Sequence, residues 1–169
     1  MKLSGKRMLC VDAVLLAVLL FADQFTKHLA VLKLKGQEAF VLINGVLELD
    51  YLENRGSAFG MLQDQKFLIV AVDLIFMAVL LFLLVKLPAD RKYVKLHILM
   101  TMVMGGGIGN MIDRLRLDHV VDFISFVLIH YPIFNVADIY IVVAVILLFI
   151  LFVFVYKEED LTWMNLSFK

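Results

Sequence analysis

Two aspartates in the second half of the chain have the type and setting needed for acid–base chemistry. Asp122 lies in "VVDF" and Asp138 in "FNVAD". Two close carboxyl groups cannot both ionise cheaply, so they share a proton and their pKa values separate. One can then take a proton from water while the other donates a proton to a carbonyl oxygen. This is the chemistry of an aspartic peptidase, which needs no metal and no covalent intermediate.

Spacing alone leaves other interpretations of these acids open. Acids in a helical membrane protein also form structural ion pairs, as Asp113 could with Arg114 or Arg116. They also relay protons in transporters, so a small proton-coupled transporter or channel is the alternative function. An internal repeat of the two halves would indicate a transporter, and the sequence shows none.

Other hydrolytic mechanisms find little support. The sequence has no HExxH motif, no GxGD motif and no phosphate-binding loop, and Ser57 does not lie in a GxSxG motif. The four histidines, His28, His97, His119 and His130, are scattered, so no metal site and no cofactor are expected. The chain has no net charge and no basic stripe, which gives no reason to expect a nucleic-acid partner.

The elements that must position the two acids are membrane helices. The chain is 63% hydrophobic with a mean hydropathy of +0.93, and a bilayer core of about 30 Å requires roughly 20 apolar residues in a helix. Four runs qualify, at about 8–30, 66–87, 93–114 and 131–156. We predict an all-α integral membrane protein with four transmembrane helices in a single membrane domain, 1–169. The first run resembles a signal peptide, but Asp12 interrupts it, so we expect it to be retained.

Basic residues set the expected orientation of these helices. Lys and Arg cluster at the N-terminus and in the loop 86–95, which places both termini in the cytoplasm. The segments 31–65 and 115–130 then face outward, and the tail 157–169 is expected to be a cytoplasmic appendage. Within 38–60, the Asn44-Gly45 dipeptide and the alternation over 47–52 predict a small extracytoplasmic β-sheet between the first two helices.

The predicted topology brings polar residues from every helix to the outer leaflet. They are Asp23, Lys27, Asn54, Arg55, Asn110, Asp113, Arg114, Asn135 and Asp138. Intramembrane polar residues are costly and usually face a bundle interior, so this convergence predicts a site. Gly105 and Gly109 are spaced for close helix packing. Asp12 and Asp73 are expected to be structural acids, and Cys10 a small core residue.

Five ordered blocks resemble the lipoprotein signal peptidase (signal peptidase II) family. The blocks are "DQFTK" (23–27), "NRGSAFG" (54–60), "GGGIGNMIDR" (105–114), "VVDF" (120–123) and "FNVAD" (134–138). The resemblance implies a catalytic pair, Asp122 and Asp138. It also implies supporting or substrate-binding roles for Asp23, Lys27, Asn54, Gly56, Asn110, Asp113, Arg114 and Asn135. Ile139 and Tyr140 depart from the expected pattern, and the segment 124–133 is expected either to shape the lipid-facing side of the site or to form a flap.

The resemblance further implies a location and a set of partners. The protein would be an aspartic endopeptidase of the bacterial cytoplasmic (inner) membrane with its active site near the extracytoplasmic face. It would cut diacylglyceryl-modified prolipoproteins just before the lipidated lipobox cysteine. Its partners would be these precursors, membrane lipids and cyclic peptide inhibitors such as globomycin, and it would act as a monomer.

Overall fold

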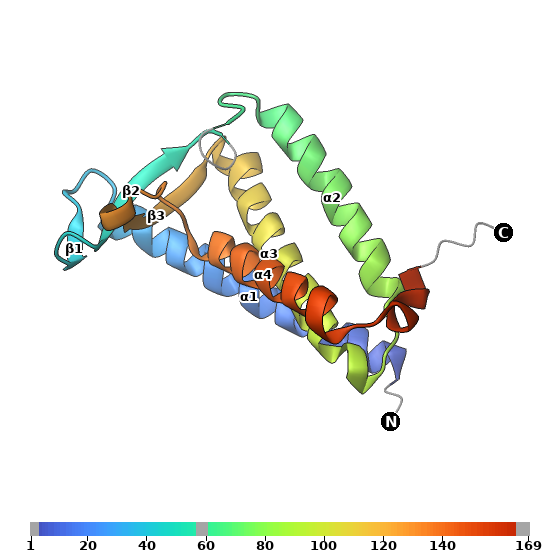
Figure 1. Cartoon of the computed structure of the whole chain (residues 1–169). Coiled ribbons are helices and arrows are strands. Elements are labelled where there is room, and N and C mark those ends of the chain that lie inside the picture. The colour runs from blue at the N-terminus through green and yellow to red at the C-terminus, as the bar shows by residue number, and fades with distance from the viewer. Residues whose placement is uncertain (1–3, 57–60, 165–169) are drawn as a thin grey trace.

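The computed structural model describes residues 4–56 and 61–164 as a helical bundle with a small sheet at one end (Figure 1). The helices are α1 (Gly5–Lys33), α2 (Lys66–Lys86), α3 (Val94–Leu117) and α4 (Val136–Ile150), and α4 continues as the π-helical turn η4 (Leu151–Val155). The strands are β1 (Phe40–Ile43), β2 (Leu47–Asn54) and β3 (Val120–Phe126). Short 3-10 helices lie at η2 (Arg91–Tyr93), η3 (Val127–Ile129) and η5 (Glu158–Met164).

Helix α3 is the centre of the bundle and packs against α1, α2 and α4. Twelve of its 24 residues are buried, more than in any other helix. Glycines permit the close approach: a Cβ added at Gly106 would lie 2.5 Å from the main-chain oxygen of Ala137 on α4. A Cβ at Gly105 would lie 3.2 Å from the Cβ of Leu19 on α1. A Cβ at Gly109 would lie 2.4 Å from Asp23 Oδ2 of α1, so the predicted close helix packing at Gly105 and Gly109 is confirmed.

Within residues 4–56 and 61–164, three helices are long and apolar enough to cross a membrane: Gly5–Lys33, Lys66–Lys86 and Val136–Val155. Large apolar side chains such as Phe21, Phe67 and Phe154 are exposed on their outer surfaces, as expected of helices that contact lipid. Helix α3 is not among them, because its polar residues lower its hydropathy. A helix enclosed by other helices can carry such residues.

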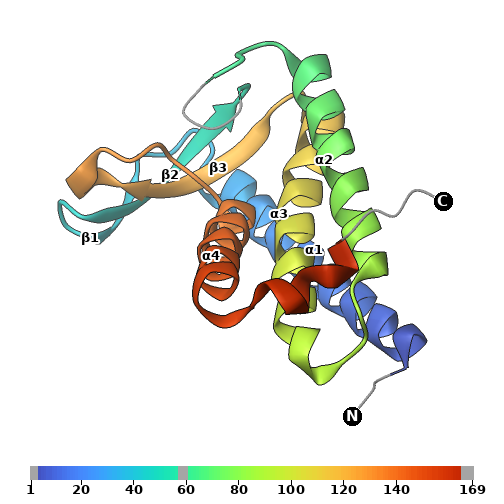
Figure 2. The same cartoon turned by 45° about the vertical axis from the view of Figure 1, so that its right-hand side comes forward.

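The sheet lies at the end of the bundle opposite the start of α1 and the end of η5 (Figures 1 and 2). Its order is β1-β2-β3 with antiparallel pairing throughout. The predicted turn at Asn44-Gly45 is confirmed, since Gly45 adopts a φ of 69° between β1 and β2. Strand β3 was not predicted: Asp118 ends α3 in the left-handed conformation, and the chain then pairs with β2.

The fourth helix begins at Val136, five residues later than the prediction of 131. Asn135 is its N-cap and forms a capping box with Asp138: the Asp138 N–H donates to Asn135 Oδ1, and the Asn135 N–H donates to Asp138 Oδ2. Pro132 therefore lies before the helix and does not start it.

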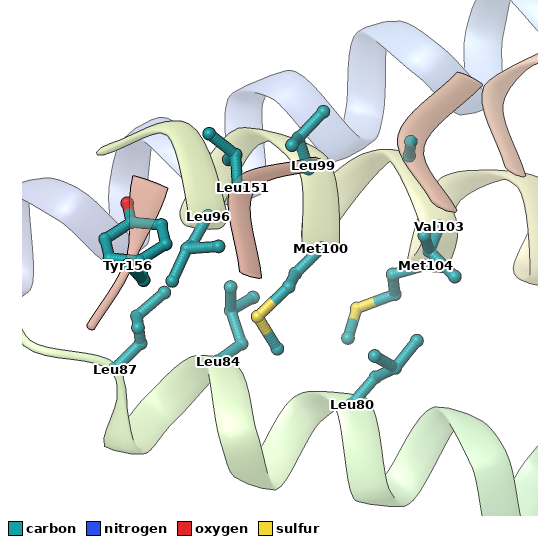
Figure 3. Close-up of a cluster of buried hydrophobic side chains, with 11 residues drawn as sticks. Leu80, Leu84, Leu87, Leu96, Leu99, Met100, Val103, Met104, Leu151 and Tyr156 are labelled. Carbon is teal, nitrogen blue, oxygen red and sulfur yellow. The ribbon is translucent and has the colours of Figure 1, made fainter. Parts of the chain in front are cut away.

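A hydrophobic core fills the end of the bundle away from the sheet. In Figure 3, Leu80 and Leu84 of α2 point toward Met100 and Met104 of α3. Leu161 and Trp163 of η5 pack against this core, and Lys92 forms an ion pair with Asp160. Residues 157–164, expected to be an appendage, thus fold back onto the bundle.

Two single-residue predictions for α1 have different outcomes. Asp12 is a buried structural acid, as predicted, and its Oδ2 lies 2.8 Å from Nδ1 of His97. The prediction that Cys10 is a core residue is wrong, because Cys10 is exposed on the outside of α1. A small apolar residue in a membrane helix fits a lipid-facing position as well as a core position.

Candidate active site

Asp122 and Asp138 line one cavity of about 570 Å³ near the sheet. The cavity is bounded by β2 and β3, the first half of α2, the second half of α3, and the start of α4 with the segment that leads into it. The side chains of Asn54, Asn110, Arg114 and Asp73 also line it. The strand that sequence analysis missed is what carries Asp122 here, because the pairing of Asp122 with Leu52 fixes it beside β2.

Asp122 is 2% exposed and accepts hydrogen bonds on both carboxyl oxygens. Asn54 Nδ2 donates to Oδ2 at 2.8 Å, and Asn135 Nδ2 donates to Oδ1 at 2.6 Å. Burial raises the pKa of Asp122 to about 6, the hydrogen bond from Asn54 opposes this rise, and the nearby charge of Asp138 adds to it. Asp122 is therefore able to hold a proton well above the pH at which an ordinary aspartate loses it.

Asp138 is held by the start of α4 and by α3. Its Oδ2 accepts the Asn135 N–H at 3.0 Å, and its Oδ1 accepts from Asn110 Nδ2 at 2.8 Å. Asn135 thus contacts both acids, through its side chain to Asp122 and through its main chain to Asp138. The fully buried Asn135 also donates to Asn110 Oδ1 at 3.1 Å, which closes the network.

Behind the two acids lies a buried ion cluster centred on Lys27. Lys27 Nζ lies 3.0 Å from Asp23 Oδ2, 3.0 Å from Asp113 Oδ2 and 2.8 Å from Asn110 Oδ1. Lys27, Asp23 and Asp113 are each at most 3% exposed. A buried charge is tolerated only when it is paired and hydrogen-bonded, and every member here is.

The ion cluster also fastens the elements that carry the two acids. Asp23 Oδ1 accepts the main-chain N–H of Ala137 at 3.2 Å, next to Asp138. Asp113 Oδ2 accepts the N–H of Val121 at 3.2 Å, next to Asp122. The cluster therefore sets the position of α4 and β3 relative to α1 and α3.

Gln24 belongs to this cluster and was missed. Its Nε2 donates to Asp113 Oδ1 at 2.9 Å and to the Gly109 oxygen at 3.2 Å. The available signal was its place between Asp23 and Lys27 in an otherwise apolar run.

A second chain of contacts leads to Asp122 from α2. Arg114 Nη1 lies 3.4 Å from Asp73 Oδ2, and Arg114 Nη2 donates to the Gly56 oxygen at 3.1 Å. The Gly56 N–H donates to Asn54 Oδ1 at 2.9 Å, and Asn54 in turn holds Asp122. Asp73 is thus hydrogen-bonded, as predicted for a structural acid, but it also lines the cavity. Residues 57–60, including Ser57, lie outside the described residues.

The structure brings all ten predicted site residues into this connected region. They are Asp23, Lys27, Asn54, Gly56, Asn110, Asp113, Arg114, Asp122, Asn135 and Asp138. Within 4–56 and 61–164, no group of three or more His, Cys, Asp or Glu side chains is arranged to hold a metal ion. What the geometry offers is two carboxyl groups in one hydrogen-bond network, open to a cavity, with one pKa raised toward neutrality.

Comparison with known proteins agrees with this geometry. A family model described as signal peptidase (SPase) II matches residues 15–154. A lipoprotein signal peptidase of Caldanaerobacter subterraneus subsp. tengcongensis is 42% identical over 142 residues, which cover 83% of this chain and 94% of that protein. One from Streptococcus thermophilus strain CNRZ 1066 is 39% identical over 147 residues, covering 87% and 93%.

Solved structures give the same result for the fold. A bacterial membrane enzyme determined by the in meso method at 2.3 Å resolution superposes with a TM-score of 0.78 at 25% identity, over 88% of this chain and 92% of that one. A second, at 1.9 Å resolution, gives a TM-score of 0.76 at 26% identity, over 86% and 94%. The chain belongs to the signal peptidase II family.

Proposed function

We propose that this protein is an aspartic endopeptidase that removes the signal peptide from diacylglyceryl-modified prolipoproteins, cutting just before the lipidated cysteine. Membership of the family supports peptidase activity on lipoprotein signal peptides. The observation that carries the aspartic mechanism is Asn135, which binds Asp122 and Asp138 at once on the wall of one cavity.

The proposed reaction uses the two acids in opposite protonation states. Asp138 takes a proton from a water molecule, whose oxygen attacks the scissile carbonyl carbon, while Asp122 donates its proton to the carbonyl oxygen. In the second step the protonated Asp138 gives its proton to the leaving amine, and Asp122 recovers a proton from the tetrahedral intermediate. The raised pKa of Asp122, about 6, supports its role as the acid of the first step.

The proposed topology has four spans in a single membrane domain. Helix α3 has 24 residues and is therefore about 36 Å long, enough to cross a bilayer core of about 30 Å. With α3 as the fourth span and the basic residues of loop 86–95 inside, both termini are cytoplasmic. The sheet and the two acids then lie near the extracytoplasmic face of the bacterial cytoplasmic membrane.

The proposed partners follow from the same topology. The large exposed apolar surface of α1, α2 and α4 fits contact with membrane lipid. The cavity of about 570 Å³ is large enough to admit part of a peptide substrate. We propose that a cyclic peptide inhibitor such as globomycin binds in the same cavity. We propose that the enzyme acts as a monomer, because one chain supplies both acids.

The test is cleavage of a diacylglyceryl-modified precursor beside the same precursor without lipid. We expect the purified protein to cut only the lipidated form, and Asp122→Asn and Asp138→Asn to abolish cleavage while the protein stays folded. Asp118→Asn is the matched control, since Asp118 lies four residues before Asp122 but is 73% exposed and pairs with Lys66. Cleavage by either dyad variant at the normal rate contradicts the mechanism. Proton flux in proteoliposomes that needs Asp138, without cleavage, would favour the transporter instead.

A further inference from the structure

The segment 131–134 forms one wall of the cavity. Phe134 pairs with Ile124 of β3: its N–H donates to the Ile124 oxygen at 3.0 Å, and its oxygen accepts the Ile124 N–H at 2.8 Å. The segment therefore adds a short extra strand to the sheet, on the side of β3 away from β2.

The direction of the neighbouring main-chain groups follows from this pairing. A trans peptide unit is planar, and its C=O and N–H point in opposite directions. The Phe134 N–H and C=O both point toward β3, so the Ile133 C=O and the Asn135 N–H, which belong to the same two peptide units, point away from β3. The Asn135 N–H accordingly donates to Asp138 Oδ2 at 3.0 Å. The Ile133 C=O therefore points to the same side of the segment as the Asn135 N–H that binds the Asp138 carboxyl group.

Ile133 leaves both of its main-chain groups available. Within the parts of the chain that the structure describes, neither its N–H nor its C=O has a hydrogen-bond partner. The residue is part of the cavity lining. A free N–H and C=O on one residue of an exposed strand is a template for another strand. Pro132, which has no N–H, precedes it and confines this template to a single residue.

We propose that the lipidated precursor crosses the cavity as an extended strand that pairs with Ile133. One substrate residue near the cleavage site donates its N–H to the Ile133 oxygen and accepts the Ile133 N–H. Since an extended residue advances the chain by about 3.3 Å, this pairing holds the scissile carbonyl beside Asp138 and Asp122. The proposal rests on the proposed function and adds how the substrate main chain is aligned.

An amide-to-ester series in a diacylglyceryl-modified lipobox peptide tests the pairing. Each ester removes one N–H donor without adding bulk, at each position from three residues before the cleaved bond to two after it. We expect one position other than the cleaved bond to lower kcat/KM about tenfold or more, because it leaves the Ile133 oxygen unpaired. The positions on either side of it should change kcat/KM less than about threefold, since their N–H groups point the other way.

Two protein variants give the reciprocal measurement. Ile133→Pro removes the N–H of this residue, and Ile133→Val keeps it and changes only the side chain. We expect Ile133→Pro to lower kcat/KM about tenfold and to reduce the penalty of the sensitive ester, because the strand pair no longer forms. Ile133→Val should behave like the unchanged protein in both respects.

The outcomes separate this inference from the function on which it rests. A flat ester series with the unchanged enzyme overturns the strand pairing even if Ile133→Pro does not fold, and it would mean that side chains or lipid alone align the substrate. Failure of the unchanged enzyme to cut the all-amide lipidated peptide would instead overturn the proposed function.

Discussion

The two ends of the contact between α1 and α3 both bury charged groups, but in different ways. At the end near the sheet, Lys27 is paired with two acids and an amide, and the surrounding network reaches a cavity. At the end far from the sheet, Asp12 and His97 form an isolated pair, and His97 Nε2 and Thr101 Oγ1 have no partner among the described residues. Burial of charge is therefore common to both, and only convergence on a cavity distinguishes the Lys27 cluster as a site.

The largest expected difference between the two ends is in activity. Asp122→Asn and Asp138→Asn should each lower kcat/KM by at least about 100-fold, the usual contribution of a general acid or base. Asp12→Asn, at the end far from the sheet, should leave kcat/KM within about threefold. The measurement is initial-rate cleavage of a lipidated precursor, with folding checked by thermal unfolding in detergent. A loss for Asp12→Asn as large as for the other two would show that the Asp12–His97 pair is as necessary for activity as the two cavity aspartates.

The second largest expected difference between the two ends is in the stability lost when a buried polar side chain is replaced. Lys27→Met leaves Asp23 and Asp113 buried without their cation, which typically costs about 3–5 kcal/mol. It should also abolish cleavage, because Asn110 loses its contact with Lys27. His97→Gln, the matched change at the end far from the sheet, keeps a side-chain N–H that can donate to Asp12 and should lower the unfolding temperature less. Equal losses of unfolding temperature would show that the two buried polar clusters contribute equally to stability.

The contact between Asn54 and Asp122 should appear in the pH profile. Asp122 must be protonated to act as the acid, so kcat/KM should fall as the pH rises through its pKa of about 6. The Asn54 hydrogen bond favours the ionised form, so Asn54→Ala raises this pKa and moves the fall in activity to higher pH. Glu48→Gln, on the same strand, should leave the profile unchanged. A shift to lower pH in Asn54→Ala would contradict the assignment of Asp122 as the acid.

The smallest expected effect belongs to Asp73. Asp73→Asn weakens the support of Arg114 and, through Gly56 and Asn54, of Asp122. One hydrogen bond of this kind is worth about 0.5–1.5 kcal/mol, so kcat/KM should fall about two- to tenfold. Asp73→Glu keeps the charge and should recover part of the loss, and the pH profile should move in the same direction as in Asn54→Ala. An effect on unfolding temperature alone would limit Asp73 to a structural role.

Much of the site was predictable because its residues are polar in places where polarity is costly. Lys27, Asn110 and Asp113 stand out against apolar neighbours, and the helix order places them in one leaflet. Gln24 and Asp73 have the same signal in weaker form, since each contacts a residue of α3 that the sequence does not identify as its partner. Only the packing of α1, α2 and α3 identifies those partners.

The fold was less predictable where pairing is non-local. The run "VVDFISF" has no alternation, because the first four residues of β3 are all buried, so it gave no strand pattern. The start of α4 was predicted too early because "YPIF" is apolar and because proline, here Pro132, is common in the first turn of helices. The spacing of Asn135 and Asp138 was a capping-box signal, and it correctly marks the helix start.

Asn135 couples the local stability of α4 to the geometry of the two aspartates. The same residue caps α4 and bridges the two carboxyl groups, so melting of a single helical turn would separate them. The free energy of that local opening, rather than of global unfolding, then sets the fraction of molecules able to react. Hydrogen exchange at the Asp138 amide, which donates to Asn135 Oδ1, would report this fraction directly.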